Sequence, residues 1–470
     1  MTHSTGPCPT FAPTLIGSAG IFVRTMTTAD ASANRSFTAK GLATRERILR
    51  SAADVLLADG LTTFNLDKVR HAASVSGSQL NHYFDDRQDL FRAVVKRQTE
   101  IVLQFHRQPK LGGLDTFEDW EQWATLNVRY LRKVGYRGTA TYHALAGQLA
   151  KSDDATRQTF ADGYWRWVNL LEDSFARMKS LGLLVNSAQP RQLALVVVSL
   201  HQGAGLLAFP YRQEWPLADA TRFVVNYVRM FAKDPDERAP RPARKPRRRP
   251  HRVDHDAAPR FTAKGMATRA RIIDGAAELI FEHGVNGTSL DDVRRAVGVS
   301  GSQISHYFTD KQDLTRQVIA ARTDFVVAFH TQEALGRLDT LESLRAWADL
   351  CWTQAGEDYL RGGCVYGSLA GELLEADDAV LDDLADGYER WLQVFVDGLS
   401  AMRRRGELTE DADPRHLAVA LVVAHQGGTL LTHVTGSAEP FRAAVNAALD
   451  YATSFASRPT RSRTRRTRSS

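Results

Sequence analysis

The amino-acid sequence predicts an all-α protein that contains two tandem copies of one helical unit. Apolar side chains recur every three or four residues, as in Phe160, Tyr164, Trp167, Leu171 and Phe175, which is the spacing of one buried helix face. No segment alternates clearly between apolar and polar residues with the period of two that half-buried strands show. An internal repeat gives the second observation.

The repeat is found by comparing the sequence with itself. FTAKGLATRERIL at 37–49 recurs as FTAKGMATRARII at 261–273, with ten of thirteen residues identical at an offset of 224. VSGSQLNHYF at 75–84 recurs at the same offset. Two units of nearly 200 residues are too long and too few for a solenoid of short repeats. We therefore predict a tandem fusion of copy one, residues 37–232, and copy two, residues 261–456.

The charge distribution separates these copies from the segments beside them. The chain carries a net charge of +6, and residues 238–252 and 458–470 together carry +14 without one acidic residue, so the rest carries −8. Both segments combine Arg with Pro or Ser and contain few apolar residues, so we expect them to be disordered. Segments of this kind act either as nucleic-acid handles or as solubilising linkers, and composition alone does not choose between them.

Each copy contains two short helices separated by a brief turn. Asn65 and Ser289 are good N-caps, and acidic residues follow them in the first helical turn, where the helix dipole favours negative charge. The turn leads into a second helix, residues 77–84 in copy one and 301–308 in copy two. Two short helices joined in this way predict a helix-turn-helix, whose second helix enters the major groove of DNA.

Further motifs accompany the helix-turn-helix. TRERIL (44–49) and TRARII (268–273) open the preceding helix, while DDRQDL (85–90) and TDKQDL (309–314) open the following one. With these motifs the sequence resembles the tetracycline-repressor (TetR) family of bacterial transcription regulators. Residues 362–373 also resemble a segment common in the ligand-binding domains of that family. The resemblance implies, in each copy, an N-terminal helix-turn-helix domain and a C-terminal helical domain for ligand binding and dimerisation.

We expect seven segments along the chain. They are a disordered leader at 1–35, helix-turn-helix domain one at 36–100, helical ligand-binding and dimerisation domain one at 101–232, a basic linker at 233–260, helix-turn-helix domain two at 261–324, helical ligand-binding and dimerisation domain two at 325–456, and a disordered Arg-rich tail at 457–470.

Gln79 and Gln303 are the best candidates for reading bases, because a side-chain amide can pair with adenine through two hydrogen bonds in the major groove. The usual family helix has a Lys and an aromatic residue where this chain has a glycine and Asn81 or Ser305, so the usual contacts do not carry over directly. The other candidates for base or phosphate contacts are Lys40, Thr44, Arg45, Ser78, Asn81, His82, Tyr83 and Arg87 in copy one, and Lys264, Thr268, Arg269, Ser302, Ser305, His306, Tyr307 and Lys311 in copy two.

The C-terminal part of each copy is rich in aromatic residues. The family resemblance implies a small-molecule pocket there, and the alternative is that these residues only pack the core. Tyr142 and Tyr366, with nearby Gln148 and Glu372, are the predicted effector-binding residues because they combine apolar and polar surface. The identity of the effector is not readable from the sequence.

Other classes of function fit poorly. We expect no enzyme and no cofactor, because the GxSxG, P-loop, GxGxxG and HExxH motifs are absent. His201 and His425 lie in apolar helices without a HxxxH or Cys/His cluster, so we expect core or interface residues rather than metal ligands. The three cysteines form no CxxC pair, as is typical of the reducing cytoplasm. Cys351 and Cys364 leave a redox sensor as an alternative.

The sequence also predicts where the chain is and how it assembles. The longest apolar stretches, 193–200 and 417–424, are shorter than the roughly 20 residues that cross a bilayer, so we expect no membrane span and a cytoplasmic protein. Such apolar helices must be covered. We expect the last two helices of each copy, about 191–209 with 218–232 and about 415–432 with 441–456, to form an intramolecular pseudo-dimer. A homodimer of chains is the alternative.

Together these observations predict a sequence-specific regulator of transcription that binds double-stranded DNA. We expect a repressor that a small-molecule effector releases from a pseudo-palindromic operator. The alternative is an architectural nucleic-acid binder that acts through its Arg-rich linker and tail and recognises no particular sequence.

Overall fold

The computed structural model describes residues 37–136, 142–238, 261–373 and 376–457. Within these ranges the regular elements are helices, with two isolated β-bridges. The predicted leader, most of the predicted linker and residues 458–470 of the predicted tail lie outside them. Residues up to Thr44 and residues from Arg45 onward form two compact units, and each is described by itself.

The described part of the first unit is short. It contains the beginning of α1 (Ala39–Thr63), where the Gly41 N–H donates to the Thr38 hydroxyl at 3.2 Å. This contact satisfies one of the backbone donors that the first turn of a helix leaves without a partner.

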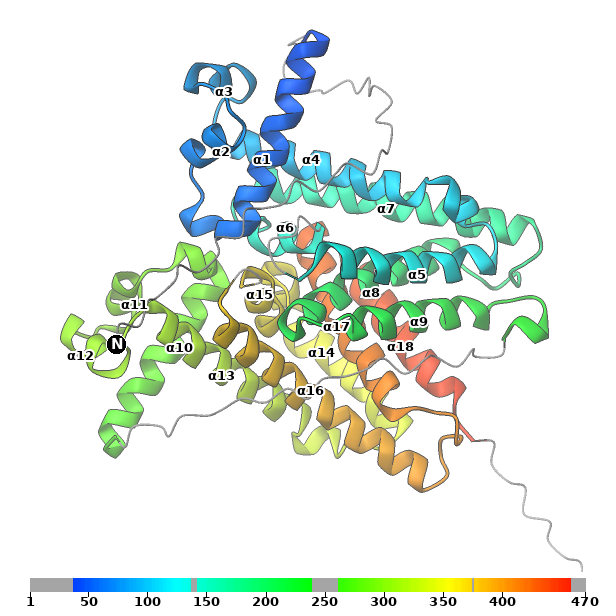
Figure 1. Cartoon of the computed structure of the whole chain (residues 1–470). Coiled ribbons are helices and arrows are strands. Elements are labelled where there is room, and N and C mark those ends of the chain that lie inside the picture. Colours follow the sequence, from blue (N-terminus) through cyan, green and yellow to red (C-terminus); the bar gives the residue numbers. More distant parts are fainter. Residues whose placement is uncertain (1–36, 137–141, 239–260, 374–375, 458–470) are drawn as a thin grey trace, which may run out of the picture. The chain divides into compact units, whose positions relative to one another are not determined.

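The second unit contains the rest of α1 and the other helices (Figure 1). The copy-one helices that follow are α2 (Leu66–Ala72), α3 (Gly77–Tyr83), α4 (Arg87–His106), α5 (Phe117–Val134), α6 (Tyr142–Leu149), α7 (Asp154–Ser180), α8 (Pro190–Tyr211) and α9 (Trp215–Met230). The copy-two helices are α10 (Ala263–Gly287), α11 (Leu290–Val297), α12 (Gly301–Tyr307), α13 (Lys311–His330), α14 (Leu341–Gly362), α15 (Val365–Glu372), α16 (Asp378–Arg404), α17 (Pro414–Thr435) and α18 (Glu439–Ser454).

The order of helices in copy one returns in copy two. Each pair of equivalent helices begins at the 224-residue offset, apart from α6 and α15, because the residues directly before Tyr142 lie outside the described ranges. The β-bridges follow the same offset, Leu184 with Ala232 and Leu408 with Ala456. Glycines with positive φ, Gly60 at 71° in α1 and Gly284 at 77° in α10, interrupt equivalent helices near their ends.

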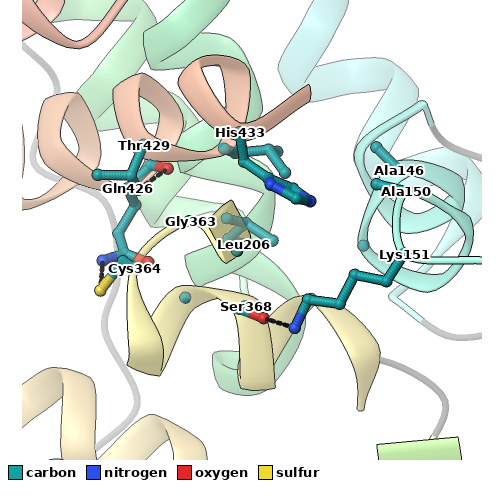
Figure 2. Close-up of a pocket in the computed structure, with 15 residues that line it drawn as sticks. Ala146, Ala150, Lys151, Leu206, Gly363, Cys364, Ser368, Gln426, Thr429 and His433 are labelled. Atoms are coloured by element: carbon teal, nitrogen blue, oxygen red, sulfur yellow. Dashed lines mark hydrogen bonds between the residues drawn. The ribbon is translucent and has the colours of Figure 1, made fainter. Parts of the chain in front are cut away.

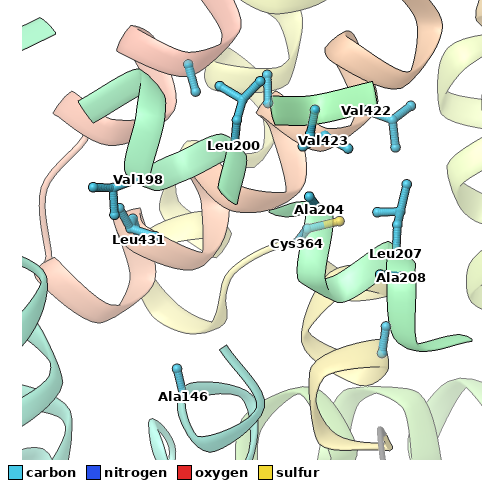
Figure 3. Close-up of a cluster of buried hydrophobic side chains, with 14 of the residues drawn as sticks. Ala146, Val198, Leu200, Ala204, Leu207, Ala208, Cys364, Val422, Val423 and Leu431 are labelled. Atoms are coloured by element: carbon cyan, nitrogen blue, oxygen red, sulfur yellow. The ribbon is translucent and has the colours of Figure 1, made fainter. Parts of the chain in front are cut away.

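The copies pack against each other mainly through α8, α9, α17 and α18, the helices that the sequence predicts for this contact. Gly203 of α8 and its equivalent Gly427 of α17 lie at the crossing. A Cβ on Gly427 would lie 2.6 Å from the Ser199 carbonyl carbon, and a Cβ on Gly203 would lie 2.7 Å from the Gly427 nitrogen. Equivalent residues that contact each other define a pseudo-twofold relation, as in an isologous dimer interface. Figure 3 shows apolar side chains of both helices around this crossing.

Both crossing helices are longer than their most apolar stretches suggest. α8 and α17 have 22 residues each and are apolar enough, by length and composition, to cross a membrane. The sequence prediction counted only uninterrupted apolar residues, so it did not identify these two helices by this measure. In each helix 94% of the apolar window is buried inside the protein, which is the behaviour of a core helix.

Candidate nucleic-acid interface and pocket

The predicted recognition helices, α3 and α12, begin with the same capping box. The Ser76 hydroxyl accepts from the Gln79 N–H at 3.1 Å, and the Ser76 N–H donates to Gln79 Oε1 at 2.9 Å. In copy two the corresponding distances between Ser300 and Gln303 are 3.2 and 2.8 Å. A reciprocal pair of this kind satisfies two helix-terminal donors and fixes where the helix starts.

The capping box limits what the two glutamines can do. Both side chains are exposed, but each Oε1 atom already accepts a backbone hydrogen bond. A two-bond contact with adenine needs that oxygen, so Gln79 or Gln303 would have to leave its capping box to make it. With the box closed, the Nε2 group can still donate one hydrogen bond to a base acceptor.

The remaining polar residues of the recognition helices lie on the same exposed surface. The hydroxyls of Ser78 and Ser302 lie 3.0 and 2.9 Å from those of the capping serines. The Ser305 hydroxyl donates to the Gly301 carbonyl at 3.2 Å, while Asn81 is exposed at the equivalent position. Leu80 and Ile304 are buried beneath them and anchor the helices to the core.

Aromatic residues end both recognition helices. His82 and Tyr83 form an edge-to-face pair with ring centroids 5.1 Å apart, and His306 and Tyr307 form the same pair at 4.9 Å. The histidines are exposed and the tyrosines are half-buried. In copy two, Phe261 packs against both rings, at 5.9 and 5.2 Å. This packing connects the residues before α10 to the recognition helix.

Arg87, which the sequence predicts as a phosphate contact, is engaged within its own domain. Its Nη2 donates to the Leu61 carbonyl at 2.9 Å, and its guanidinium lies over the rings of Phe64 and Phe91. Burial lowers the pKa of Arg87. The side chain therefore holds α1 to α4 within its own domain. Its counterpart Lys311 is half-buried, and burial lowers its pKa as well.

Lysines and threonines at the start of the first helix of each copy are also predicted to contact DNA. Lys40 and Lys264 are exposed, and each lysine carbonyl accepts from a threonine hydroxyl one turn later, Thr44 at 3.1 Å and Thr268 at 3.0 Å. These threonine hydroxyls therefore cap backbone groups within their own helices. The lysine ammonium groups are the exposed positive charges at this position.

The arginines that follow these threonines pack on buried aromatic residues. The Arg45 guanidinium lies 5.3 Å from the Phe84 ring centroid, and the Arg269 guanidinium lies 5.7 Å from that of Phe308. Arg269 also donates to Gln317. Both arginines are half-buried and stabilise the contact between the first helix and the end of the recognition helix.

Basic side chains of α2 and α11 are balanced by carboxylates of the same helices. Arg70 pairs with Asp67 at 3.1 Å, and Arg294 pairs with Asp291 at 2.7 Å. The hydrogen bond from Arg294 lowers the pKa of Asp291. Phosphate contacts by these arginines would compete with ion pairs that are already formed.

Copy two contains a pocket of about 290 Å³ between its helix-turn-helix domain and its C-terminal helices. Its walls include aromatic residues from four helices, namely Phe281, Phe325, Phe329, Tyr359 and Trp391. Cys364 and His425 also line it, and Arg322 and Arg361 pair with Glu278 and Asp358 of the same lining. The copy-one residues equivalent to Gly363–Val365 of this wall, 139–141, lie outside the described residues.

The four predicted effector residues lie elsewhere. Tyr142 and Tyr366 are buried, and their hydroxyls donate to backbone carbonyls of α7 and α16, at 3.3 and 2.7 Å. Gln148 is buried in the core, and Glu372 forms contacts between the copies. None of the four lines the aromatic pocket. The sequence left open whether such aromatic residues line a pocket or pack the core, and the burial and backbone hydrogen bonds of both tyrosines correspond to core packing.

The buried histidines have structural partners. Trp391 Nε1 donates to His330 Nε2 at 3.0 Å, and the other ring nitrogen of His330 contacts the Val326 carbonyl at 2.7 Å. Burial lowers the pKa of His330 to about 4 and that of His425 to about 3. His201 Nε2 lies 2.9 Å from Asn127 Oδ1. Among the described residues, no group of three or more His, Cys, Asp or Glu side chains could hold a metal ion.

The two cysteines of copy two are not activated. Cys351 and Cys364 are both buried and not disulfide-bonded, and burial raises the pKa of each thiol. Because the thiolate is the reactive form, this environment disfavours the redox-sensor alternative.

Comparison with known proteins identifies the family. The model of bacterial regulatory proteins of the tetR family matches residues 272–318, and the model of the tetracyclin repressor-like C-terminal domain matches residues 340–448. Both matches lie in copy two.

Individual relatives match about the length of one copy. The transcriptional regulator AcuR of Cereibacter sphaeroides is 25% identical over 173 residues, which are 37% of this chain and 79% of AcuR. The HTH-type transcriptional repressor ComR of Escherichia coli K12 is 28% identical over 205 residues, 42% of this chain and 87% of ComR. A crystal structure of regulatory protein TetR from Rhodobacter sphaeroides covers 39% of this chain and 98% of its own, at 22% identity and a TM-score of 0.36.

These relatives are regulators and not enzymes. The matched residues of copy two contain the helix-turn-helix of α11 and α12 followed by the C-terminal helices. On these grounds copy two carries the N-terminal and C-terminal domains of the TetR family of bacterial transcriptional regulators.

Proposed function

We propose that the chain is a single-chain repressor that reads a pseudo-palindromic operator in double-stranded DNA with α3 and α12. A small molecule that fills the copy-two pocket releases it. The observation that carries the proposal is the repeated recognition surface: the same capping box occurs twice, and the exposed residues of the two helices differ only at Asn81 and Ser305. The copies that carry these surfaces cross through equivalent glycines. Such a regulator acts on DNA in the cytoplasm.

The repeat suggests the form of the operator. Residues 75–84 and 299–308 differ at two positions only, so the two half-sites should be nearly identical. A pseudo-twofold arrangement would separate them by about one DNA turn, roughly 34–36 Å. The family models match copy two only. We include copy one as a second unit of the same kind because its sequence repeats that of copy two.

Release by an effector would act through Phe281. This residue belongs to α10, the first helix of helix-turn-helix domain two, and its ring lines the pocket. A ligand that displaces the ring therefore displaces α10. The inner hydrogen-bonding groups already pair with each other, Tyr359 with His425 at 2.9 Å and Trp391 with His330 at 3.0 Å. The pocket therefore suits a planar, largely apolar molecule.

The test begins with the operator. Duplexes selected from a random pool by the full chain give a specific sequence, and a scrambled duplex of equal length serves as the control. Gln303→Ala should weaken specific binding by about 1–3 kcal/mol and leave scrambled binding almost unchanged. Because alanine also removes the capping acceptor, Gln303→Glu serves as the cap control, since a glutamate at this position preserves a capping box.

The outcome separates three cases. If Gln303→Ala loses more affinity for the selected duplex than for the scrambled one, and Gln303→Glu unfolds thermally like the wild type, the result supports base reading by Gln303. Equal losses on both duplexes would show that Gln303 does not read bases. Steeply salt-dependent binding without preference for the selected duplex would favour the architectural alternative.

A further inference from the structure

Lys151 of copy one reaches into copy two at the base of helix-turn-helix domain two. Its ammonium group donates to the Phe281 carbonyl at 2.9 Å, to the Ser368 hydroxyl at 2.6 Å and to Glu372 Oε1 at 3.0 Å. Figure 2 shows the extended side chain and its bond to Ser368. The side chains of Lys151 and Glu372 are only 12% and 6% exposed. Three acceptors satisfy the three hydrogens of the ammonium group, as a buried charge requires.

Glu372 extends this contact to the backbone of α10. Its second oxygen, Oε2, accepts from the Val285 N–H at 2.6 Å, directly after the kink at Gly284. One carboxylate therefore joins three segments: α15, the end of α10 and the segment of copy one that follows α6. We name Lys151, Ser368, Glu372 and the backbone groups of Phe281 and Val285 the lysine junction.

The cavity beside the lysine junction has a volume of only about 20 Å³. This space accommodates one water-sized group and no effector. The lysine junction is therefore a structural contact and not a second ligand site. Its connection to the aromatic pocket is Phe281, whose ring lines that pocket and whose carbonyl accepts from Lys151.

The residues of the lysine junction are not repeated in copy one. At the 224-residue offset, Ala144 replaces Ser368, Gln148 replaces Glu372, and Glu375, which lies outside the described residues, replaces Lys151. A glutamine and a glutamate do not form an ion pair. The lysine junction is thus a departure from the pseudo-twofold relation that the interface otherwise follows.

The end of the first helix is held differently in copy one. Leu61 is equivalent to Val285, and its carbonyl accepts from Arg87, a residue of the same helix-turn-helix domain. In copy two the equivalent backbone segment is held by Glu372 of the C-terminal domain, and through it by copy one. The Leu61 carbonyl is thus held by its own domain, while the Val285 N–H is held by the C-terminal domain of copy two and, through Glu372, by copy one.

We propose that Lys151 is a positioning residue that fixes helix-turn-helix domain two relative to the interface between the copies. The DNA part of this inference rests on the proposed function, since it concerns how α12 is set against the operator. The consequence is that copy one helps to position α12. The lysine junction thereby contributes to the spacing of the half-sites, and an effector beside Phe281 acts on a domain that this junction holds.

The test compares backbone hydrogen exchange in full-length variants. Lys151→Met removes the ammonium group, and Ser368→Ala with Glu372→Gln gives copy two the residues that copy one carries. Arg191→Met is the matched control, because Arg191 pairs with Glu439 across the copies, at 2.8 Å, away from both helix-turn-helix domains. We expect exchange around Val285 to accelerate at least tenfold in both junction variants, with no change around Leu61 and none at either position in the control.

A second readout uses the selected operator and a duplex in which one half-site is displaced by one base pair. The wild type should prefer the selected spacing, and Lys151→Met should reduce that preference at least tenfold. Binding to a duplex with a single half-site should change less than twofold, because α12 itself is intact. Lys151→Arg, which keeps the charge, should restore both the spacing preference and the slow exchange.

Several results would overturn the inference. Equal acceleration in both copies, or acceleration in Arg191→Met, would show general loosening of the fold. Unchanged spacing preference in folded junction variants would remove the positioning role. If Lys151→Met fails to fold, the Ser368→Ala/Glu372→Gln chain decides, since copy one folds with those residues. If the wild type binds no duplex specifically, the proposed function fails, while the exchange comparison still supports or overturns the tie to the interface.

Discussion

Replacing Gly427 by alanine tests whether the copies hold each other together. The added Cβ would lie 2.6 Å from the Ser199 carbonyl carbon and 2.8 Å from the Gly203 nitrogen, whereas ordinary contact begins at 3.4 Å. Both neighbours are backbone atoms, so no flexible side chain can move aside, and α8 and α17 must separate. Overpacking a core usually costs about 1–3 kcal/mol. We expect a loss at the upper end of this range or beyond, because the crossing helices are buried on most sides.

The assay is equilibrium unfolding in urea, followed by circular dichroism. Gly77→Ala is the control, since a Cβ at that helical position meets nothing within 4 Å. The free energy of unfolding of the control should match that of the wild type within about 0.5 kcal/mol. A Gly427→Ala loss no larger than that of the control would refute the backbone-to-backbone crossing.

Three further predictions concern pH, salt and assembly. Burial lowers the pKa of His106 to about 4, so its stabilising neutral form is fully present above the unfolded value near 6.5 and is lost as the pH falls toward 4. When the pH falls from 7.5 to 5, the free energy of unfolding measured in urea should decrease by about 2 kcal/mol less in His106→Gln than in the wild type. An equal decrease in both proteins would contradict this. Deleting residues 458–470, which carry six arginines, should make the salt dependence of DNA binding shallower without changing sequence preference, and an unchanged slope would leave the tail as a solubility device. Light scattering at micromolar concentration should give a mass near 52.2 kDa, whereas a stable mass of twice that value would replace the pseudo-dimer with a homodimer.

The sequence predicts much of the fold because its signals are local. Apolar periodicity and the repeat indicate the helices, and the N-caps Asn65 and Ser289 indicate where α2 and α11 begin. Periodicity and N-caps depend on residues within a few positions of one another, while the repeat is found by comparing residues 224 positions apart. The bounds of α8 and α17 lie within three residues of the predicted ranges, about 191–209 and about 415–432.

The sites are predictable to a smaller extent. The exposed face of the recognition helices follows from the motif, but the engagement of Gln79 Oε1 in the capping box and of Arg87 with Leu61 requires coordinates. Lys151 has no local signal at all, because its ion-pair partner Glu372 lies 221 residues away. Comparing the copies position by position would have identified it, since a lysine in one and a glutamate in the other mark a site that the duplicated fold does not share.

The packing of α8 against α17 within one chain also affects how such a regulator responds to its own abundance. A regulator assembled from separate subunits loses its paired form on dilution, so its DNA occupancy falls faster than its concentration. Here the partner helix is covalently present, and its effective concentration is set by the tether and not by the number of molecules in the cell. Operator occupancy should then rise in simple proportion to protein at low expression, which makes a few molecules per cell sufficient for a graded response.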